Sequence, residues 1–238
     1  MQIHKAVVKH TLATLGYELQ RTRNHHHPFE DMSRFVTSSI PVLFDVGANV
    51  GQTVEIFRRH FKHSIIHSFE PSPAAFQTLR EQTVGISGLH LTNTGLGASP
   101  GTKTFVENEK LDMSSFLEPG QECWGSVRKR AQLQLDTIDE YCARTGVKYI
   151  DVLKSDTQGF ELEVLRGASG MFERKRIRLV YLEIILSAMY QGLPGMDEIC
   201  KFLFERNFRV VSFYDMHYQN DLLSWTDVLF VDPSYSAE

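Results

Sequence analysis

From residue 41 onward, short apolar stretches of the chain alternate with amphipathic ones. Apolar runs of this length predict β-strands, and apolar positions that recur every three to four residues predict helices. Strands are expected at residues 42–46, 64–69, 89–94, 149–155, 178–184, 209–214 and 228–232. Helices are expected at residues 52–61, 73–83, 135–145, 160–168 and 196–207. Such alternation indicates an α/β fold, in which helices cover both faces of a mostly parallel sheet.

Two regions depart from this alternation. No helical pattern separates the last two strands, so these two strands are expected to pair antiparallel. Residues 101–133 contain a further strand pattern, GTKTFVEN, followed by MSSFLEPGQECWG, whose Gly, Ser and Pro content predicts an irregular loop.

The N-terminal part of the chain follows another pattern. Residues 2–21 carry apolar side chains at spacings typical of an amphipathic helix. The stretch from Arg21 to Ser39 is polar and indicates a linker or a lid. We therefore divide the chain into an N-terminal helical or lid segment, residues 1–40, and a main domain, residues 41–238, and expect the segment to cover one side of the functional site.

The polar stretch contains three adjacent histidines, His25, His26 and His27. Adjacent residues do not share one face of a helix or strand, so they make a poor preformed metal site. A solvated loop is the simpler interpretation, and a metal or substrate contact is the alternative.

Charge and cysteine content narrow the classes of partner. The net charge is -4 and the isoelectric point is ≈ 6.2, whereas a nucleic-acid-binding domain usually has a basic face and a high isoelectric point. The three cysteines, Cys123, Cys142 and Cys200, are too far apart for a disulfide framework or a zinc site, which favours the reducing cytoplasm. No signal-peptide pattern and no membrane span of about 18 apolar residues is expected. The sequence is compatible with a homo-oligomer as well as with a monomer.

The first predicted strand runs into the sequence PVLFDVGANVG, residues 41–51. In open parallel sheets, ligands bind outside the carboxyl ends of the strands, where the strand order reverses. Gly47 and Gly51 would let the backbone turn tightly and approach a ligand there. Asp45 would repel a phosphate but attract a cation, and the G-x-x-x-G spacing is not the dinucleotide-binding one. These features favour S-adenosylmethionine, which carries an ammonium and a sulfonium, over a dinucleotide; a packing turn is the alternative.

A second acid ends the next predicted strand. Glu70 lies in HSFEPSP, 25 positions after Asp45, where an acid can accept hydrogen bonds from ribose hydroxyls. Pro71 and Pro73 stop the strand and open a helix, with Ser72 as its expected N-cap. A surface acid is the alternative interpretation of Glu70.

A third group of polar residues follows the fourth main strand, in YIDVLKSDTQGFELEVLRGA. Methyl transfer requires in-line positioning of the reactants and a group that takes the proton of the acceptor. Asp156 is the first candidate for that group, with Glu183 and Lys154 as further catalytic candidates. Alternatively, Asp156 caps the following helix, or Asp156 and Glu183 share a divalent cation. No third oxygen ligand is identifiable, so no metal is expected.

Four motifs in order, FDVGANVGQ, FEP, LDTIDEYC and IDVLKSDTQGFELEVLRGA, resemble the FkbM-type family of S-adenosylmethionine-dependent methyltransferases. The resemblance extends from about Val42 to Val231. It implies a Rossmann-like class I methyltransferase with a seven-stranded sheet, so that residues 41–238 form the methyltransferase domain. It also implies O-methylation of a sugar or another small-molecule acceptor.

The resemblance also places individual residues. Asp156 would lie beside the transferred methyl group, and Ser114 and Ser115 match a serine pair common in the family. Ser155 and Thr157 depart from the family pattern, which more often has apolar residues there. The expected cofactor residues are, from the methionine end to the adenine, Asp45, Gly47, Asn49 and Gly51, then Glu70 and Ser72, then Thr94.

Two other functions are compatible with such a sheet. One is an NAD-dependent oxidoreductase, against which the glycine spacing argues. The other is a non-catalytic binding module on a methyltransferase core, against which the acids at both strand ends argue. Aromatic residues in the acceptor region could form a sugar-stacking wall or be ordinary core and rim, and His217 could act as a base. These residues are Trp124, Tyr190, Tyr214, His217, Tyr218 and Trp225.

Overall fold

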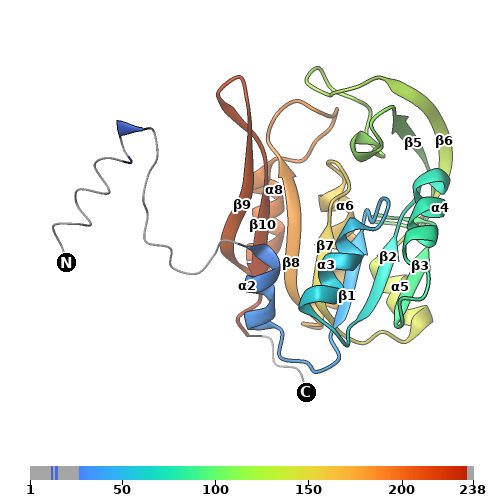
Figure 1. Ribbon diagram of the computed structural model, residues 1–238, viewed down its shortest axis with the longest axis vertical. Coiled ribbons are helices and arrows are strands. Elements are labelled where there is room, and N and C mark those ends of the chain that lie inside the picture. The colour runs from blue at the N-terminus through green and yellow to red at the C-terminus, as the bar shows by residue number, and fades with distance from the viewer. Residues whose placement is uncertain (1–11, 13, 16–26, 235–238) are drawn as a thin grey trace.

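The computed structural model describes residues 27–234, together with residues 12, 14 and 15. Its main sheet has seven strands in the order β3-β2-β1-β7-β8-β10-β9 (Figure 1). The first five of these are parallel, and β10 runs antiparallel to both β8 and β9. The α/β fold and the antiparallel pairing of the last two strands are thus confirmed. The strands are β1 (Val42–Val46), β2 (Ile65–Phe69), β3 (Leu89–Thr92), β7 (Ile150–Ser155), β8 (Ile177–Ile185), β9 (Arg209–Gln219) and β10 (Leu222–Val231).

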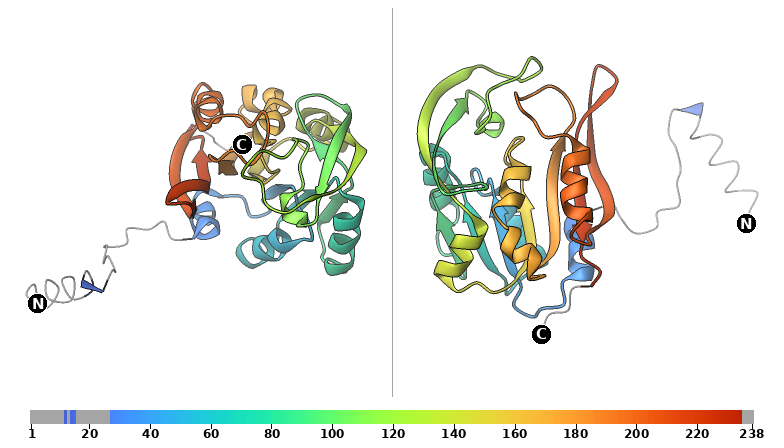
Figure 2. Two further views of the ribbon diagram at one scale, coloured as in Figure 1. Left: turned by 90° about the horizontal axis from the view of Figure 1, so that it is seen from above. Right: turned by 180° about the vertical axis from the view of Figure 1, so that it is seen from behind.

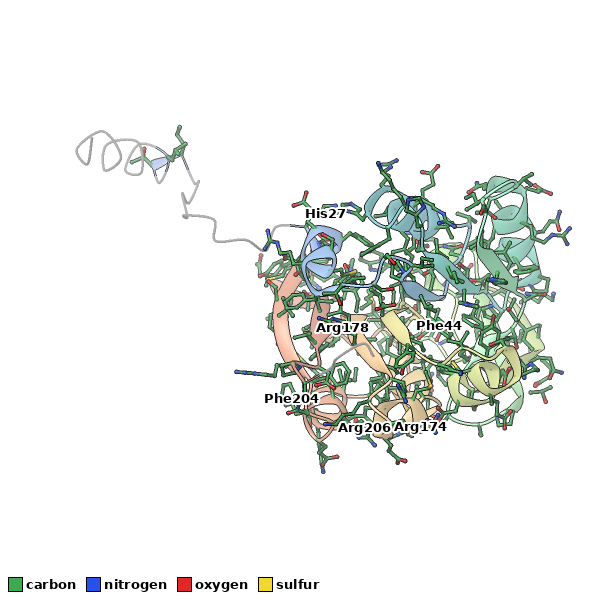
Figure 3. The ribbon with its side chains drawn as sticks, turned by 90° about the horizontal axis from the view of Figure 1, so that it is seen from below. His27, Phe44, Arg174, Arg178, Phe204 and Arg206 are labelled. Carbon is green, nitrogen blue, oxygen red and sulfur yellow. The ribbon has the colours of Figure 1, made fainter. Side chains whose placement is uncertain are left out.

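Helices cover both faces of this sheet (Figures 1 and 2). Neighbouring residues of β1, Leu43 and Phe44, belong to separate buried apolar clusters, because successive side chains of a strand point to opposite faces. Figure 3 shows Phe44 in the interior, between His27 on one side and Arg174 and Arg206 on the other. One face carries α2 (Pro28–Phe35), α3 (Gln52–His60) and α4 (Pro73–Gln82), and the other carries α5 (Ile138–Thr145), α6 (Glu161–Arg166), α7 (Ser169–Glu173) and α8 (Met196–Phe204).

A second, three-stranded sheet has the order β4-β6-β5 and stands beyond the carboxyl ends of the parallel strands. It consists of β4 (Gly95–Leu96), β5 (Gly101–Asn108) and β6 (Val127–Asp136), and the 3₁₀ helix η1 (Leu111–Met113) lies in the long connection between β5 and β6. The β9–β10 hairpin extends past the same edge of the main sheet (Figure 1). These two projections flank the crevice in which a ligand would bind.

The sequence predicted β5 but not β6, whose last two residues were assigned to a helix starting at residue 135. In the structure that helix, α5, starts at Ile138, because the Thr137 hydroxyl caps it by accepting a hydrogen bond from the Glu140 N–H (3.0 Å). The helix expected at 160–168 is also shorter. It ends before Gly167, where a Cβ atom would lie 2.0 Å from the Gly97 carbonyl oxygen.

Part of the N-terminal segment is a packed helix rather than a linker. Phe29 and Met32 of α2 are buried against α3 and the sheet, and the Tyr214 hydroxyl donates to Asp31 (2.7 Å). His27 precedes this helix and stacks on His60. His25, His26 and most of the helix predicted at 2–21 lie outside the described residues. None of the helices within the described ranges is long and apolar enough to cross a bilayer.

A buried histidine, His67 of β2, is held between two rings. Its Nδ1 lies 2.8 Å from the Tyr141 hydroxyl, and its ring stacks on His90 at 4.7 Å. Its Nε2 is buried without a hydrogen-bond partner among the described residues. Burial, and then the neighbouring His90, lower the pKa of His67 to about 4. The folded protein therefore favours neutral His67, whereas the unfolded chain binds a proton near the ordinary pKa of 6.5.

We expect His67 to make the protein less stable as the pH falls from 6.5 toward 4, because only the unfolded state takes up the proton there. Urea unfolding of the wild type and of His67→Phe across this range measures the effect as the difference between the two stability profiles. His63→Phe, at an exposed position, is the matched control and should follow the wild type. A wild-type to His67→Phe difference that does not change with pH would contradict the prediction.

Candidate active site

A cavity of about 370 Å³ lies at the carboxyl ends of β1, β2, β7 and β8, beneath the β5–β6 connection. Four carboxylates line it, and Lys110 is the one cationic side chain in its described lining. Such a lining attracts a positively charged ligand and repels an anionic one. Toward β2 the lining includes Gly47, Asn49, Glu70, Ser72, Gly95, Phe105 and Phe116, and toward β8 it includes Asp112, Met113, Trp124, Asp156, Gln158, Glu183 and Trp225.

The loop after β1 uses its backbone donors within the protein. The N–H groups of Gly47 and Ala48 both donate to the Phe69 carbonyl oxygen (3.0 Å each), and the Asn49 N–H donates to Glu70 Oε2 (2.9 Å). A pyrophosphate-binding loop needs such N–H groups free for its ligand, so these three residues do not form a phosphate cradle. Asn49 instead offers its side-chain Oδ1, which is buried and has no hydrogen-bond partner among the described residues.

Glu70 is almost fully buried where β2 ends. It accepts hydrogen bonds from the backbone N–H groups of Asn49 and Ser72 (2.9 and 2.7 Å), which fix both of its oxygens. Burial raises the pKa of Glu70 to about 7 in spite of these donors. Ser72 also accepts from the Ala75 N–H at the start of α4, which confirms the predicted N-cap. Both side chains line the cavity, where a ligand hydroxyl could donate to Glu70.

Asp45 and Lys154 lie one layer below the cavity. They are register partners on the adjacent strands β1 and β7, and Lys154 Nζ lies 3.2 Å from Asp45 Oδ1 and 3.5 Å from Asp156 Oδ2. Burial disfavours the charge of Lys154, but the carboxylates of Asp45, Asp156 and Asp227 outweigh it and raise the pKa of the lysine. Asp45 is completely buried, and neither Asp45 nor Lys154 lines the cavity.

These positions change two predicted roles. Asp45 was expected to contact the cofactor, but its carboxylate instead neutralises the Lys154 ammonium, because its side chain points along the sheet toward β7. Lys154 was grouped with the catalytic candidates; its ammonium orients Asp156 from below and does not reach the cavity.

Asp156 and Glu183 come together as the sequence predicted, although they lie on different strand ends. Gln158 Nε2 donates to both, at 2.6 Å from Glu183 Oε2 and 3.2 Å from Asp156 Oδ1. Burial, and then the nearby charges of Asp156, Glu161 and Asp227, raise the pKa of Glu183 well above its ordinary value. Glu161 is buried in α6 and accepts from the Thr157 N–H and hydroxyl, so its role is structural.

Three further candidates of the cofactor set occupy structural positions. A Cβ atom on Gly47 would lie 1.9 Å from the Asp156 carbonyl oxygen, so this glycine lets two protein loops meet, and it also lines the cavity. Gly51 does not line the cavity and lets α3 pack on Leu79 of α4. The Thr94 hydroxyl donates to the Gln134 carbonyl oxygen, and its neighbours Gly95 and Leu96 reach the cavity in its place.

The aromatic residues of the acceptor region fall into two groups. Trp124 and Trp225 line the cavity and contact each other edge to face, with ring centroids 5.3 Å apart, and His217 stacks on Trp225. Tyr190 is buried behind Gln158, Tyr214 bonds Asp31 on the α2 face, and Tyr218 is exposed on the β9–β10 hairpin. The sugar-stacking wall is therefore at most Trp124, Trp225 and His217.

Several lining residues were missed from the sequence. Phe105, Lys110, Asp112, Met113 and Phe116 come from β5 and the connection after it, which folds over the crevice. An irregular connection has no periodicity that would mark its inward-facing side chains.

The N-terminal segment was expected to cover one side of the functional site. None of its residues from 27 to 40 lines the cavity, and its other residues, apart from 12, 14 and 15, lie outside the described part of the chain. Within the described ranges, no group of three or more His, Cys, Asp or Glu side chains is arranged to hold a metal ion.

Comparison with models of known protein families identifies the family to which the chain belongs. The model of the FkbM methyltransferase domain matches residues 45–210, which include the loop after β1, Glu70, and the Asp156 turn. The chain belongs to the FkbM methyltransferase family.

Several relatives of this FkbM chain carry descriptive names. The 2-O-methyltransferase NoeI of Sinorhizobium fredii is 24% identical over 194 residues, which cover 77% of this chain and 78% of NoeI. The hexuronic acid methyltransferase AglP of Haloferax volcanii is 29% identical over 146 residues, which cover 60% of this chain and 55% of AglP. The chain spans 57% and 61% of the length of the methyltransferases that it matches in Beauveria bassiana and Sordaria araneosa.

Among solved structures, a putative rRNA methylase from Clostridium thermocellum has the same fold. Its TM-score is 0.51 at 9% sequence identity, and the match covers 90% of this chain and 99% of that one. This likeness supports the Rossmann-like methyltransferase architecture that the FkbM resemblance implied.

The buried ion pair of this FkbM domain gives a testable prediction. Lys154→Met should lower the free energy of unfolding by about 3–5 kcal/mol, because it leaves the completely buried Asp45 carboxylate without a counter-ion. The double variant Asp45→Asn/Lys154→Met should recover most of that loss. Urea unfolding measures both, with Lys148→Met at an exposed position as the control. A double variant that is no more stable than Lys154→Met would show that the two side chains do not compensate each other.

Proposed function

We propose that this protein is an S-adenosylmethionine-dependent O-methyltransferase that methylates a hydroxyl of a sugar or of a glycosylated small molecule. The observation that carries the proposal is the cavity at the carboxyl ends of β1, β2, β7 and β8. Among the described residues, its charged lining consists of four carboxylates and one lysine, and the N–H groups of Gly47, Ala48 and Asn49 in its glycine loop are already bonded within the protein. A cationic nucleoside fits such a cavity, whereas a dinucleotide diphosphate does not.

The β2 side of the cavity fits the cofactor. Glu70 can accept from the ribose hydroxyls, and the unpartnered Oδ1 of Asn49 can accept from an N–H donor of the ligand. Phe105 and Phe116 contribute apolar walls on the same side, suited to the adenine ring. In this assignment Gly47 and Ser72 border the cofactor, whereas Asp45, Gly51 and Thr94 support the surrounding chain.

The β8 side of the cavity fits the acceptor. Trp124 and Trp225 offer aromatic surface on which the apolar face of a sugar can pack, next to polar groups that can bond its hydroxyls. The relatives NoeI and AglP, named for 2-O-methylation and for hexuronic acid methylation, support oxygen as the methyl acceptor and a carbohydrate as the substrate.

Asp156 is placed to receive the proton of that hydroxyl. When S-adenosylmethionine is bound, transfer breaks its S–CH₃ bond, forms the O–CH₃ bond and releases the hydroxyl proton. Asp156 lines the cavity with its side chain 40% exposed and held by Lys154, so it can accept this proton from a bound hydroxyl. The cavity walls orient the hydroxyl and limit access of water.

Calorimetry tests the cofactor assignment. We expect S-adenosylmethionine and S-adenosylhomocysteine to bind, and NADH to give no heat of binding, because the N–H groups of Gly47, Ala48 and Asn49 are already bonded within the protein and the cavity carries four carboxylates. Glu70→Gln should weaken the binding of both cofactor forms. Tight NADH binding, or no binding of either sulfur nucleoside at millimolar concentration, would overturn the proposal.

Activity on a panel of glycosides tests Asp156, with transfer of a labelled methyl group as the readout. Asp156→Asn should lower turnover by about 10²–10⁴-fold, because the amide cannot take up a proton. Affinity for S-adenosylmethionine should stay within a few-fold, since the cofactor side of the cavity is unchanged. Unchanged turnover would remove Asp156 from the mechanism.

A further inference from the structure

Gln158 has an unusual backbone conformation in the turn between β7 and α6. Its φ angle is 55°, in the left-handed region that residues other than glycine seldom adopt. Its carbonyl oxygen accepts a hydrogen bond from the Ser115 hydroxyl (2.7 Å), which ties the turn to the segment after η1. This conformation costs free energy and directs the Gln158 side chain between Asp156 and Glu183.

The orientation of the Gln158 amide follows from its partners. Asp156 is paired with the Lys154 ammonium and accepts hydrogen bonds, so the NH₂ group faces Asp156 and, beside it, Glu183. The carbonyl Oε1 then points to the Tyr190 hydroxyl, which donates to it at 2.9 Å. Tyr190 is buried, and its hydroxyl also lies 3.1 Å from the Met113 carbonyl oxygen in η1. The amide is thus held at both ends.

Without this amide, Asp156 and Glu183 would lose the donor that bonds to both of them. Neighbouring carboxylates repel when both are ionised, and they reduce the repulsion by sharing one proton. A shared proton would occupy the group that has to accept the proton of the substrate. The two N–H donors of Gln158 stabilise both carboxylates without supplying a proton.

We propose that Gln158, oriented by the Tyr190 hydroxyl, is a positioning unit that keeps Asp156 and Glu183 from sharing a proton and so leaves Asp156 free to act as the base. This inference rests on the proposed methyl transfer for its catalytic part. The arrangement of the carboxylates themselves does not depend on a cofactor or an acceptor.

Other charged groups also face the pair, and their influence has to stay constant in any test. They lie on several of the surrounding elements, and the test variants leave all of these residues in place. They are Lys154 of β7, Glu161 of α6, Asp227 of β10, and Lys110 and Asp112 of the β5–β6 connection.

Two variants test the unit with little change in side-chain volume. Gln158→Met removes the amide, and Tyr190→Phe removes only the hydroxyl that orients it. Tyr149→Phe is the matched control, since Tyr149 lies at the amino end of β7, away from the cavity, and contacts Arg176.

The first measurement needs neither cofactor nor acceptor. Carbon-13 NMR of protein labelled at its carboxylates, titrated with acid, follows the ionisation of Asp156 and Glu183, with Glu183→Gln identifying one resonance. We expect the Glu183 titration to move to higher pH in Gln158→Met, less so in Tyr190→Phe, and not at all in Tyr149→Phe. An identical titration in Gln158→Met and wild type would overturn the inference, whatever the activity of the protein.

The second measurement uses methyl transfer to the acceptor. In Gln158→Met we expect kcat to fall by at least about 10-fold and the acidic limb of its pH profile to move to higher pH. The Kd for S-adenosylmethionine and the acceptor KM should stay within about threefold. A kcat and pH profile equal to those of Tyr149→Phe would remove the positioning role. A wild-type protein that binds no S-adenosylmethionine would instead refute the proposed function and leave the NMR result to decide the inference.

Discussion

One buried ammonium connects the two halves of the candidate site. Lys154 Nζ lies between the carboxylates of the fully buried Asp45 and the half-exposed Asp156, and is itself almost completely buried. A charge in such a place persists only when opposite charges compensate for its lost hydration. The parallel register of β1 and β7 provides this, because it sets Asp45 beside Lys154. The loop after β1, which borders the proposed cofactor, and the turn after β7, which carries Asp156, are thereby held in one fixed relation.

That relation explains how the two sequence motifs act together. Gly47, two positions after Asp45, lies so close to the Asp156 carbonyl oxygen that no side chain fits there. Beyond this contact the chains separate: Asn49 and Glu70 face one side of the cavity, and Gln158 and Glu183 face the other. On the proposed function, the methyl group would be transferred above the part of the sheet that the ion pairs of Lys154 with Asp45 and Asp156 hold together. Such a position suits a reaction that depends mainly on alignment of the reactants.

The sequence predicted the main sheet well because its central strands are buried on both faces and form continuous apolar runs, while its helices have one apolar face. It did not predict β6, whose charged first half, VRKR, conceals the alternation in QLQLD that follows. Strand-end positions were also predictable, which is why Glu70, Asp156 and Glu183 were found. The direction of a side chain at a strand end depends on its neighbour strand, so Asp45 and Lys154 were assigned to the cavity although they bind each other. Lys110, Asp112 and Met113 lie in an irregular connection over the cavity. Its sequence has no periodicity that marks inward-facing side chains, because their direction depends on tertiary contacts with the main sheet.

The concentration of carboxylates at this edge has a cost that a bound cation offsets. Burial and mutual repulsion raise the pKa values of Glu70, to about 7, and of Glu183, so that both oppose ionisation in the unliganded protein. On the proposed function, a ligand that brings an ammonium and a sulfonium into the cavity favours the ionised carboxylates and lowers these pKa values. Binding of the cofactor and ionisation of Glu70 and Glu183 are then thermodynamically linked, because each favours the other. The carboxylates that favour a positively charged nucleoside are thus most fully ionised when the methyl donor is in place.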